Sequence, residues 1–160
     1  MENTWPIYFK DRLIISNKKS ANVIVTLWTP KETIQKLTDS DSYYIIGQLY
    51  TKKGINYFLR NIFANPVITD IYLVGNDLMQ SGDALVALME NGIDERHNII
   101  GVESGVIEVE IPKEAIDLFR QKVKLHDHRG AQNIVKMKEF VIRNDASGGW
   151  MRPTRYPDPP

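Results

Sequence analysis

The chain has 160 residues, enough for one domain with a substantial core. Its 20 basic and 20 acidic residues cancel, so no global field attracts nucleic acid or an anionic membrane surface. The lack of cysteine excludes disulfides, thiolate metal sites and a cysteine nucleophile. No stretch approaches the roughly 20 apolar residues of a transmembrane helix. We therefore expect a cytoplasmic protein with no nucleic-acid partner and no membrane partner.

In the first third of the chain, the sequence pattern predicts short strands and one short helix. Residues 5–16 read as an extended or hairpin segment with Trp5 on the surface. The β-branched run at residues 22–27 (NVIVTL) indicates a strand buried on both faces. A short helix is expected within residues 34–42, and a second strand over residues 43–47.

The middle of the chain gives a clearer alternation. Apolar side chains recur at helical spacing from Ile55 to Phe63, and the Asn65-Pro66 pair ends that helix because the residue before proline avoids the α region. A strand follows at residues 70–74. Ser81 is expected to cap the next helix, which Asn91-Gly92 terminates.

The second half predicts two further strands before the last helices. Gly105 marks a tight turn, and the sequence after it alternates apolar and acidic residues as a half-exposed strand does. In order we expect two strands, a helix that begins near Pro112, a late strand and a final helix, over residues 98–101, 106–110, 112–123, 123–127 and 131–143.

These elements predict an α/β fold, a three-layer Rossmann-like sandwich with a mostly parallel sheet. We assign residues 1–145 to this domain and residues 146–160 to a tail or linker, because SGGWMRPTRYPDPP is rich in proline and glycine. Such a tail suggests that the chain is the N-terminal module of a longer protein. A further hypothesis makes Trp150, Met151 and Tyr156 an apolar docking surface.

In such a sheet, ligands bind beyond the carboxyl ends of the strands. Tyr50 and Trp28 offer flat faces on which a pterin, a corrin edge or a base can stack. Alternatively, these are solvated loop residues. The candidate ligand-binding residues are Gln48, Tyr50, Asn76, Asp77, Gln80, Ser81, Gly82 and Gly105.

The remaining motifs do not identify a phosphate-binding, catalytic or metal site. The turn from Gly75 to Gly82 matches neither the dinucleotide fingerprint nor the P-loop. Asp77 and Asp83 are candidates for a general base or a Mg²⁺ site, but we favour a role in caps and turns. His126 and His128 would share one face of a strand, as two metal ligands must, but a third ligand is lacking. We therefore nominate no catalytic residue and no metal site.

Four stretches resemble, in order, the A subunit of tetrahydromethanopterin S-methyltransferase, the MtrA family. They are GQLYTKKGINYFLRNIFANP, LVGNDLMQSGDALVALMENGID, IIGVESGVIEVEIP and IPKEAIDLFRQKVKLHD, and they include the helix end Glu90-Asn91-Gly92 and the segment Ile99-Ile100-Gly101. The resemblance covers residues 5–127. It implies the family's cytoplasmic α/β, Rossmann-like domain and its corrinoid cofactor.

The chain departs from this family at one position that matters for chemistry. The family's turn after the third strand carries a histidine that ligates the corrinoid cobalt from below, and residues 75–82 contain no histidine. The resemblance therefore implies an accessory or ligand-binding domain of one-carbon metabolism that does not carry methyl on cobalt. The cofactor stays open, with cobalamin or a pterin as candidates.

Similar domains are fused ahead of thymidylate synthase-like domains in archaea, so the expected partner is a fused or docked catalytic domain of that kind. Three alternatives stay open. The chain could bind cobalamin without a lower histidine, act as a small enzyme through Asp77 or Asp83, or serve only as a non-catalytic interaction domain.

Overall fold

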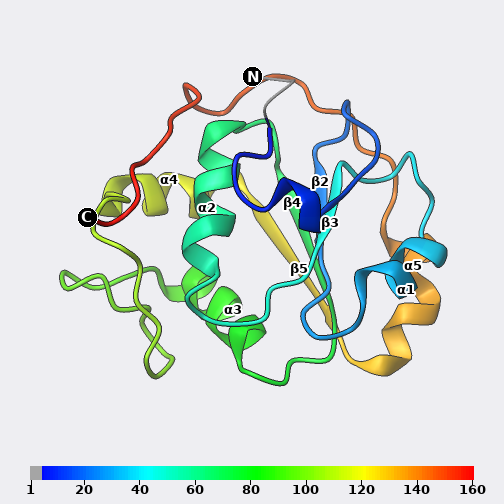
Figure 1. Ribbon diagram of the computed structural model, residues 1–160, viewed down its shortest axis with the longest axis horizontal. Coiled ribbons are helices and arrows are strands. Elements are labelled where there is room, and N and C mark those ends of the chain that lie inside the picture. The colour runs from blue at the N-terminus through cyan, green and yellow to red at the C-terminus, as the bar shows by residue number, and fades with distance from the viewer. Residues whose placement is uncertain (1–4) are drawn as a thin grey trace.

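The computed structural model describes residues 5–160, so the first four residues of the expected domain lie outside the described part (Figure 1). The described elements, in chain order, are η1 (Lys10–Arg12), β1 (Ile14–Ile15), β2 (Asn22–Val25), α1 (Lys31–Lys36), β3 (Ile45–Gly47), α2 (Ile55–Ala64), β4 (Asp70–Gly75), α3 (Ser81–Asn91), α4 (Lys113–Lys122), β5 (Lys124–Arg129), η2 (Ala131–Lys136) and α5 (Met137–Phe140).

The strands form one sheet in the order β1-β3-β2-β4-β5. The short β1 pairs antiparallel with β3, and the other neighbours are parallel. Helices α2, α3 and α4 cover one face of the sheet, and α1, η2 and α5 cover the other (Figure 1). This arrangement confirms the predicted three-layer α/β sandwich with a mostly parallel sheet.

The central strand β2 contributes side chains to the cores on both faces of the sheet. All four of its residues are buried. Val23 and Val25 contact the large apolar core under α2, α3 and α4, whereas Ile24 contacts a smaller core under α1 and α5. Successive side chains of a strand point to opposite faces, so one β-branched run supplies both cores.

Helix α2 forms where the apolar spacing predicts it. Ile55, Leu59, Ile62 and Phe63 are each at most 2 % exposed. Burial of one such side chain contributes about 1.5–3 kcal/mol relative to its exposure. The helix ends at Ala64, directly before the Asn65-Pro66 pair.

The expected strands at residues 98–101 and 106–110 are wrong. Residues 92–112 form an irregular loop that contains only isolated bridges, Ile93 with Ile99 and Asn98 with Val106. The apolar–acidic alternation does not match the exposure of its residues, since the apolar Val109 is 72 % exposed, and alternation does not create a partner strand.

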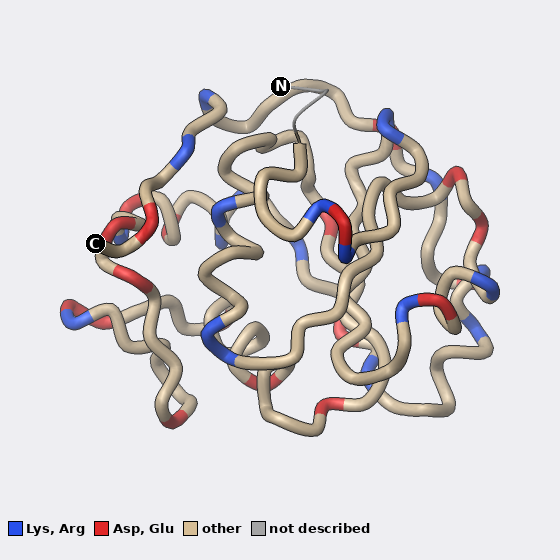
Figure 2. The backbone as a smooth tube through the Cα atoms, in the orientation of Figure 1, with Lys and Arg blue, Asp and Glu red and all other residues tan. Residues whose placement is uncertain are grey.

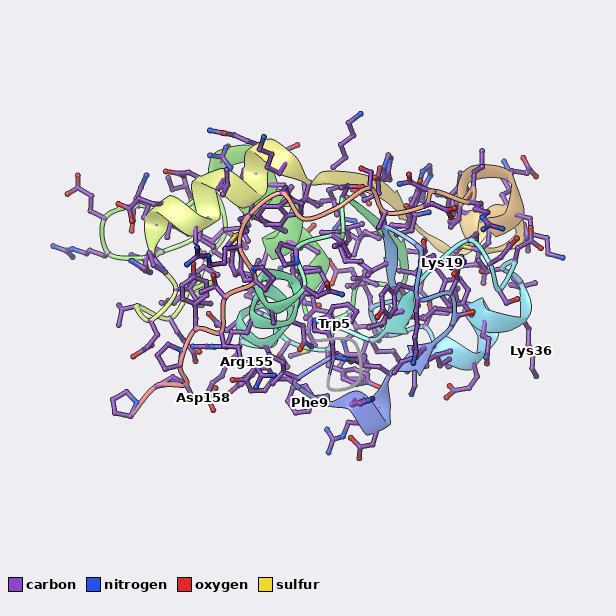
Figure 3. All side chains as sticks on the ribbon, turned by 90° about the horizontal axis from the view of Figure 1, so that it is seen from above. Trp5, Phe9, Lys19, Lys36, Arg155 and Asp158 are labelled. Carbon is purple, nitrogen blue, oxygen red and sulfur yellow. The ribbon has the colours of Figure 1, made fainter. Side chains whose placement is uncertain are left out.

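Three further expectations need correction. The final helix is split into η2 and α5, and Val141 already has an extended backbone. Helix α1 begins at Lys31 and ends at Lys36, earlier than expected. Trp5 is not a surface residue, because it is 2 % exposed and its Nε1 donates to the Asn61 carbonyl at 2.6 Å. Figure 3 shows Trp5 inside the molecule and Phe9 at its margin.

The segment after α5 crosses over the amino ends of the parallel strands and runs down beside α2 (Figure 1). Trp150 Nε1 donates to the Ile68 carbonyl at 2.8 Å, and the Thr154 amide donates to the Phe63 carbonyl at 2.9 Å. Trp150, Met151 and Tyr156, the hypothetical docking residues, pack against the domain's own core. In this structure they are therefore an internal contact.

Charges of both signs alternate along the chain rather than gathering in one segment (Figure 2). Within residues 5–160, no helix combines the length and the apolar character that crossing a membrane requires.

Candidate functional site

The loops that follow β2, β3 and β4 meet at the carboxyl end of the sheet, at the bottom of Figure 1. The Trp28 amide donates to the Asn76 carbonyl at 3.0 Å, and the Asn76 amide donates to Thr29 Oγ1 at 3.0 Å. Gly75 makes this approach possible. Its φ is +88°, and a Cβ there would lie 2.6 Å from Thr29 Oγ1. The site is thus built on directly joined loops.

An acidic depression of about 540 Å³ lies at the ends of β4 and β5, and it is lined by Gly75, Asn76, Asp77, Asp83, Asp127, Arg129 and Gly130. Arg129 occupies its centre. The guanidinium contacts Asp83 Oδ1 at 2.7 Å, Asp77 Oδ2 at 3.2 Å and both oxygens of Asp127 at 2.9 and 2.8 Å. The carboxylates of the depression are therefore already paired with a cation.

The pKa values around Arg129 follow from this pairing. Burial alone would raise the pKa of the Asp127 carboxyl, but the hydrogen bonds from Arg129 outweigh it and hold the pKa below its ordinary value. The pKa of Arg129 is raised, chiefly by its hydrogen bond to Asp127. A general base at neutral pH needs a pKa near 7, so Asp127 is poorly suited to that role.

Asp77 caps helix α3. Its carboxylate accepts from the Gly82 amide at 3.1 Å and from the Asp83 amide at 2.9 Å, which satisfies two free donors of the helix start. This confirms the interpretation of Asp77 as a helix cap. Gly82 leaves room for this cap, because a Cβ would lie 2.7 Å from Asp77 Oδ2 and the carboxylate would have to move.

Ser81 is not the cap that the sequence predicts. Its side chain is buried, and its Oγ donates to the Leu49 carbonyl at 2.7 Å, which joins α3 to the loop after β3. The loop folds back at Gln80, whose φ is 62°, and this brings Asp77 to the helix start instead. A serine followed by a helix does not reveal such a reversal.

Gln48 also has a role within the fold. Its Nε2 donates to the Leu27 carbonyl at 3.2 Å, and its Oε1 accepts from the Lys31 amide at 3.3 Å. It therefore fixes the loop after β2 against the start of α1. By contrast, the side chains of Asn76 and Gln80 are exposed at the sheet end.

Four large apolar side chains are exposed beside this polar cluster, and we call them the apolar rim. They are Trp28 at 38 %, Tyr50 at 46 %, Leu78 at 67 % and Met79 at 54 % exposed. The Trp28 and Tyr50 rings meet edge to face, with centroids 4.9 Å apart, and Trp28 Nε1 donates to the Tyr50 carbonyl at 3.2 Å.

A second hollow of about 410 Å³ lies next to this rim and is lined by Thr51, Lys52, Leu78, Met79 and Gln80. Leu78 and Met79 were not among the sequence candidates. A signal for them existed, because two consecutive large apolar residues stand in an otherwise polar turn, NDLMQSGD.

Gly105 does not follow a strand, so the strand-end argument that made it a site candidate fails. Its carbonyl accepts from the Ile99 amide at 2.8 Å inside the irregular loop. The same loop nevertheless approaches the site, since Lys52 Nζ donates to the Glu103 carbonyl at 2.5 Å.

The two histidines of β5 lie on one face, as the strand pattern predicts, but they have other partners. His126 Nε2 lies 2.7 Å from Asp70 Oδ2, and its ring stacks on Tyr72 at 4.4 Å. His128 stacks on Phe140 at 3.9 Å, and burial followed by the proximity of His126 lowers its pKa. Within residues 5–160, no three His, Asp or Glu side chains are grouped to hold a metal ion.

Comparisons with known proteins identify the family of this chain. The MtrA family, described as the A subunit of tetrahydromethanopterin S-methyltransferase, matches residues 1–148. The A subunit of a putative methyltransferase, Mtx, from Methanosarcina barkeri is 30 % identical over 141 residues, which cover 86 % of this chain and 68 % of that protein.

A second A subunit of tetrahydromethanopterin S-methyltransferase, numbered 2, from Methanothermobacter thermautotrophicus is 31 % identical over 128 residues, 77 % of this chain and 68 % of the relative. The A subunit from Methanocaldococcus jannaschii is 28 % identical over 142 residues, 86 % of this chain and 58 % of the relative. The family match covers most of the sequence, and the chain therefore belongs to the MtrA family of tetrahydromethanopterin S-methyltransferase A subunits.

Proposed function

We propose that this chain is an accessory domain of methyl-transfer metabolism that binds a partner or a ligand through the apolar rim. The observation that carries the proposal is the exposure of Leu78 and Met79, 67 % and 54 %, at the tip of the loop between β4 and α3. Large exposed apolar groups rimmed by polar residues mark interaction sites. The carboxyl end of a parallel sheet is also where such folds place their ligands.

The residues of this loop do not fit a corrinoid that an imidazole ligates from below. Residues 75–82 contain no histidine. Asp77 is engaged by α3 and Arg129, and Ser81 by the Leu49 carbonyl. The remaining donors are the neutral amides of Asn76 and Gln80 and the thioether of Met79, which is a soft ligand and a poor substitute for imidazole. We therefore derive no methyl transfer through cobalt for this chain.

A protein partner matches the rim best. The relatives are named as subunits, and the partner that we propose is a catalytic domain of the thymidylate synthase-like kind, docked or fused. The rim offers such a domain two aromatic faces and two flexible aliphatic side chains. Aromatic residues and methionine are enriched at the buried centres of protein interfaces.

A second candidate is a flat ligand, cobalamin or a pterin, bound without an axial protein ligand. The observation in its favour is the aromatic pair Trp28 and Tyr50 near the hollow of about 410 Å³. Aromatic faces that are exposed at a ligand site can stack on a conjugated ring system.

Titration with cobalamin, followed by corrin absorbance and melting temperature, tests the corrinoid form of the second candidate against the first. A ligand that binds the native state stabilises it by about 2.7 kcal/mol at a concentration of 100 Kd. An unchanged melting temperature and corrin spectrum at high micromolar cobalamin would support the partner-binding role. A perturbed spectrum that Tyr50→Ala abolishes and Phe9→Ala preserves would overturn it in favour of the corrinoid, since Phe9 is similarly exposed at 48 %.

Partner binding is tested with a separately purified thymidylate synthase-like domain and analytical ultracentrifugation. Leu78→Asp places a charge on the rim. Val135→Asp places the same charge on η2, at a position that is 73 % exposed, compared with 67 % for Leu78. We expect Leu78→Asp to abolish the complex and Val135→Asp to retain it. Equal binding by both variants would show that the rim is not the docking surface.

A further inference from the structure

Helix α2 carries two polar side chains on its buried face. Asn56 and Arg60 are each 1 % exposed and lie four residues apart, so they are neighbours on that face. Asn56 holds the irregular loop of residues 92–112. Its Oδ1 accepts from the Glu108 amide at 2.7 Å, and its Nδ2 donates to the Val106 carbonyl at 3.2 Å.

Arg60 joins the same loop to the C-terminal strap, which we define as residues 149–158. Nη1 contacts Glu108 Oε1 at 2.5 Å, Nη2 donates to the Pro157 carbonyl at 2.8 Å, and Nε donates to the Tyr156 carbonyl at 3.3 Å. The strap lies along α2 on the outside of the molecule (Figures 1 and 3). One buried guanidinium therefore bonds two segments that are far apart in the sequence.

The irregular loop also reaches the candidate site. Lys52 Nζ donates to the Glu103 carbonyl at 2.5 Å, and Lys52 lines the hollow beside Leu78 and Met79. The loop is tied together internally, since the Ile99 amide donates to the Gly105 carbonyl at 2.8 Å and the Ile107 amide to the His97 carbonyl at 2.8 Å. The loop therefore connects Glu108 to the Lys52 contact through its own hydrogen bonds.

We propose that Arg60 couples the docking of the C-terminal strap to the position of the irregular loop, and through Lys52 to the apolar rim. When the strap leaves, Arg60 loses the Tyr156 and Pro157 carbonyls together with part of its cover. The freed guanidinium donors need new acceptors, so the local structure rearranges to satisfy them. Arg60 has two anionic partners, Glu108 at 2.5 Å and Asp158 at 4.0 Å. Asp158 belongs to the strap and leaves with it, so Glu108 remains and the rearrangement falls on the loop.

The coupling is reciprocal by thermodynamic necessity: whatever fixes the loop also favours the docked strap. Its extension to binding at the rim rests on the proposed function, whereas the coupling of strap and loop does not. Hydrogen exchange of the free protein therefore tests the coupling separately from any partner or ligand.

The experiment compares amide hydrogen exchange by mass spectrometry in the full chain and three variants. Tyr156→Ala removes the ring that packs on Phe63 in the strap, with centroids 5.3 Å apart, and leaves the Arg60–Glu108 pair in place. Glu108→Gln weakens the ion pair between Arg60 and the irregular loop. Arg143→Met is the control, because Arg143 is exposed and pairs with Asp145 away from both segments.

We expect Tyr156→Ala to accelerate exchange in residues 102–112, and Glu108→Gln to accelerate it in the strap, each by about tenfold, a typical size for coupling between sites. The control should leave both segments at the wild-type rates. Faster exchange confined to the strap in Tyr156→Ala, with the loop unchanged, would overturn the proposal. Neither variant removes Arg60, so the test does not depend on whether an Arg60 variant folds.

Discussion

The buried face of α2 and the loops at the carboxyl end of the sheet use their polar residues in opposite ways. On α2, Asn56, Arg60 and Asn61 are all engaged, and Asn61 alone binds the backbone of both Ile7 and Tyr8. At the sheet end, the Asn76 and Gln80 side chains face solvent beside four exposed apolar groups. The polar residues of α2 bind other segments of the same chain. The loops at the carboxyl end of the sheet leave side chains exposed that a partner or ligand can contact.

In this chain, a polar side chain is therefore not by itself a sign of a functional site. The polar residues of α2 are structural because they satisfy backbone groups of segments that lack regular pairing. At the sheet end, Asp77, Ser81 and Gln48 do the same for loops and helix starts. What remains free there is mainly apolar, and that surface is the one that a partner or ligand can cover.

The largest expected effect tests the structural region. Phe63→Ala on α2 removes a fully buried ring that contacts the rings of Phe119, Trp150 and Tyr156. We expect urea denaturation to show a loss of about 3–5 kcal/mol in the free energy of unfolding. Leu78→Ala, the matched change on the rim, should stay within about 0.5 kcal/mol of wild type. Equal losses for both variants would contradict the division into two regions.

A smaller loss of stability is expected for Asp77, which has a structural role at the carboxyl end of the sheet. Asp77→Ala removes the cap of α3 and one partner of Arg129, and should cost about 1–2 kcal/mol in urea denaturation. Asp77→Asn retains an acceptor oxygen for the helix amides and should cost less. If the alanine variant were as stable as wild type, the assignment of Asp77 as a cap would fail.

The next prediction concerns strain at the rim. Gln80 has a left-handed backbone with φ 62° and an exposed side chain. Gln80→Gly should stabilise the fold by about 0.5–1 kcal/mol, because relief of the left-handed conformation exceeds the greater entropy of glycine in the unfolded chain. Gln132→Gly on η2, where φ is not positive, should destabilise it slightly. Thermal melting of the two variants measures this contrast.

The smallest effect is confined to alkaline pH. Tyr8 Oη donates to Asp158 Oδ1 at 2.6 Å, and burial together with this hydrogen bond raises the pKa of Tyr8 to about 12. The folded state thus favours the protonated phenol. The resulting stability is fully present below the unfolded pKa of 10.0 and is lost as the pH rises through about 12.

Tyr8→Phe should remove this contribution, so wild type should be slightly more stable than the variant at neutral pH, and this advantage should disappear as the pH rises through about 12. The measurement is the difference in urea midpoint between the two proteins across pH 9 to 12, a range around the unfolded and folded pKa values of Tyr8. Parallel curves for the two proteins would show that the Tyr8–Asp158 contact does not respond to alkaline pH.

Local sequence patterns were enough to predict the elements that depend on neighbouring residues. The β-branched run of β2, the apolar spacing of α2 and the Asn65-Pro66 stop each specify a conformation through contacts within a few residues. Their order then implied a parallel sheet and a site at its carboxyl end. The family resemblance was also carried by the sequence alone and is confirmed by the family match.

The roles of individual side chains became visible in the folded protein. Ser81 reads as a cap, but the reversal at Gln80 brings Asp77 to that position. Residues 106–110 alternate like a strand but have no strand to pair with. Trp5 and Arg60 owe their burial to segments more than 45 residues away. Hydrogen-bond partners and burial depend on which distant segments meet, and a local sequence pattern does not contain that information.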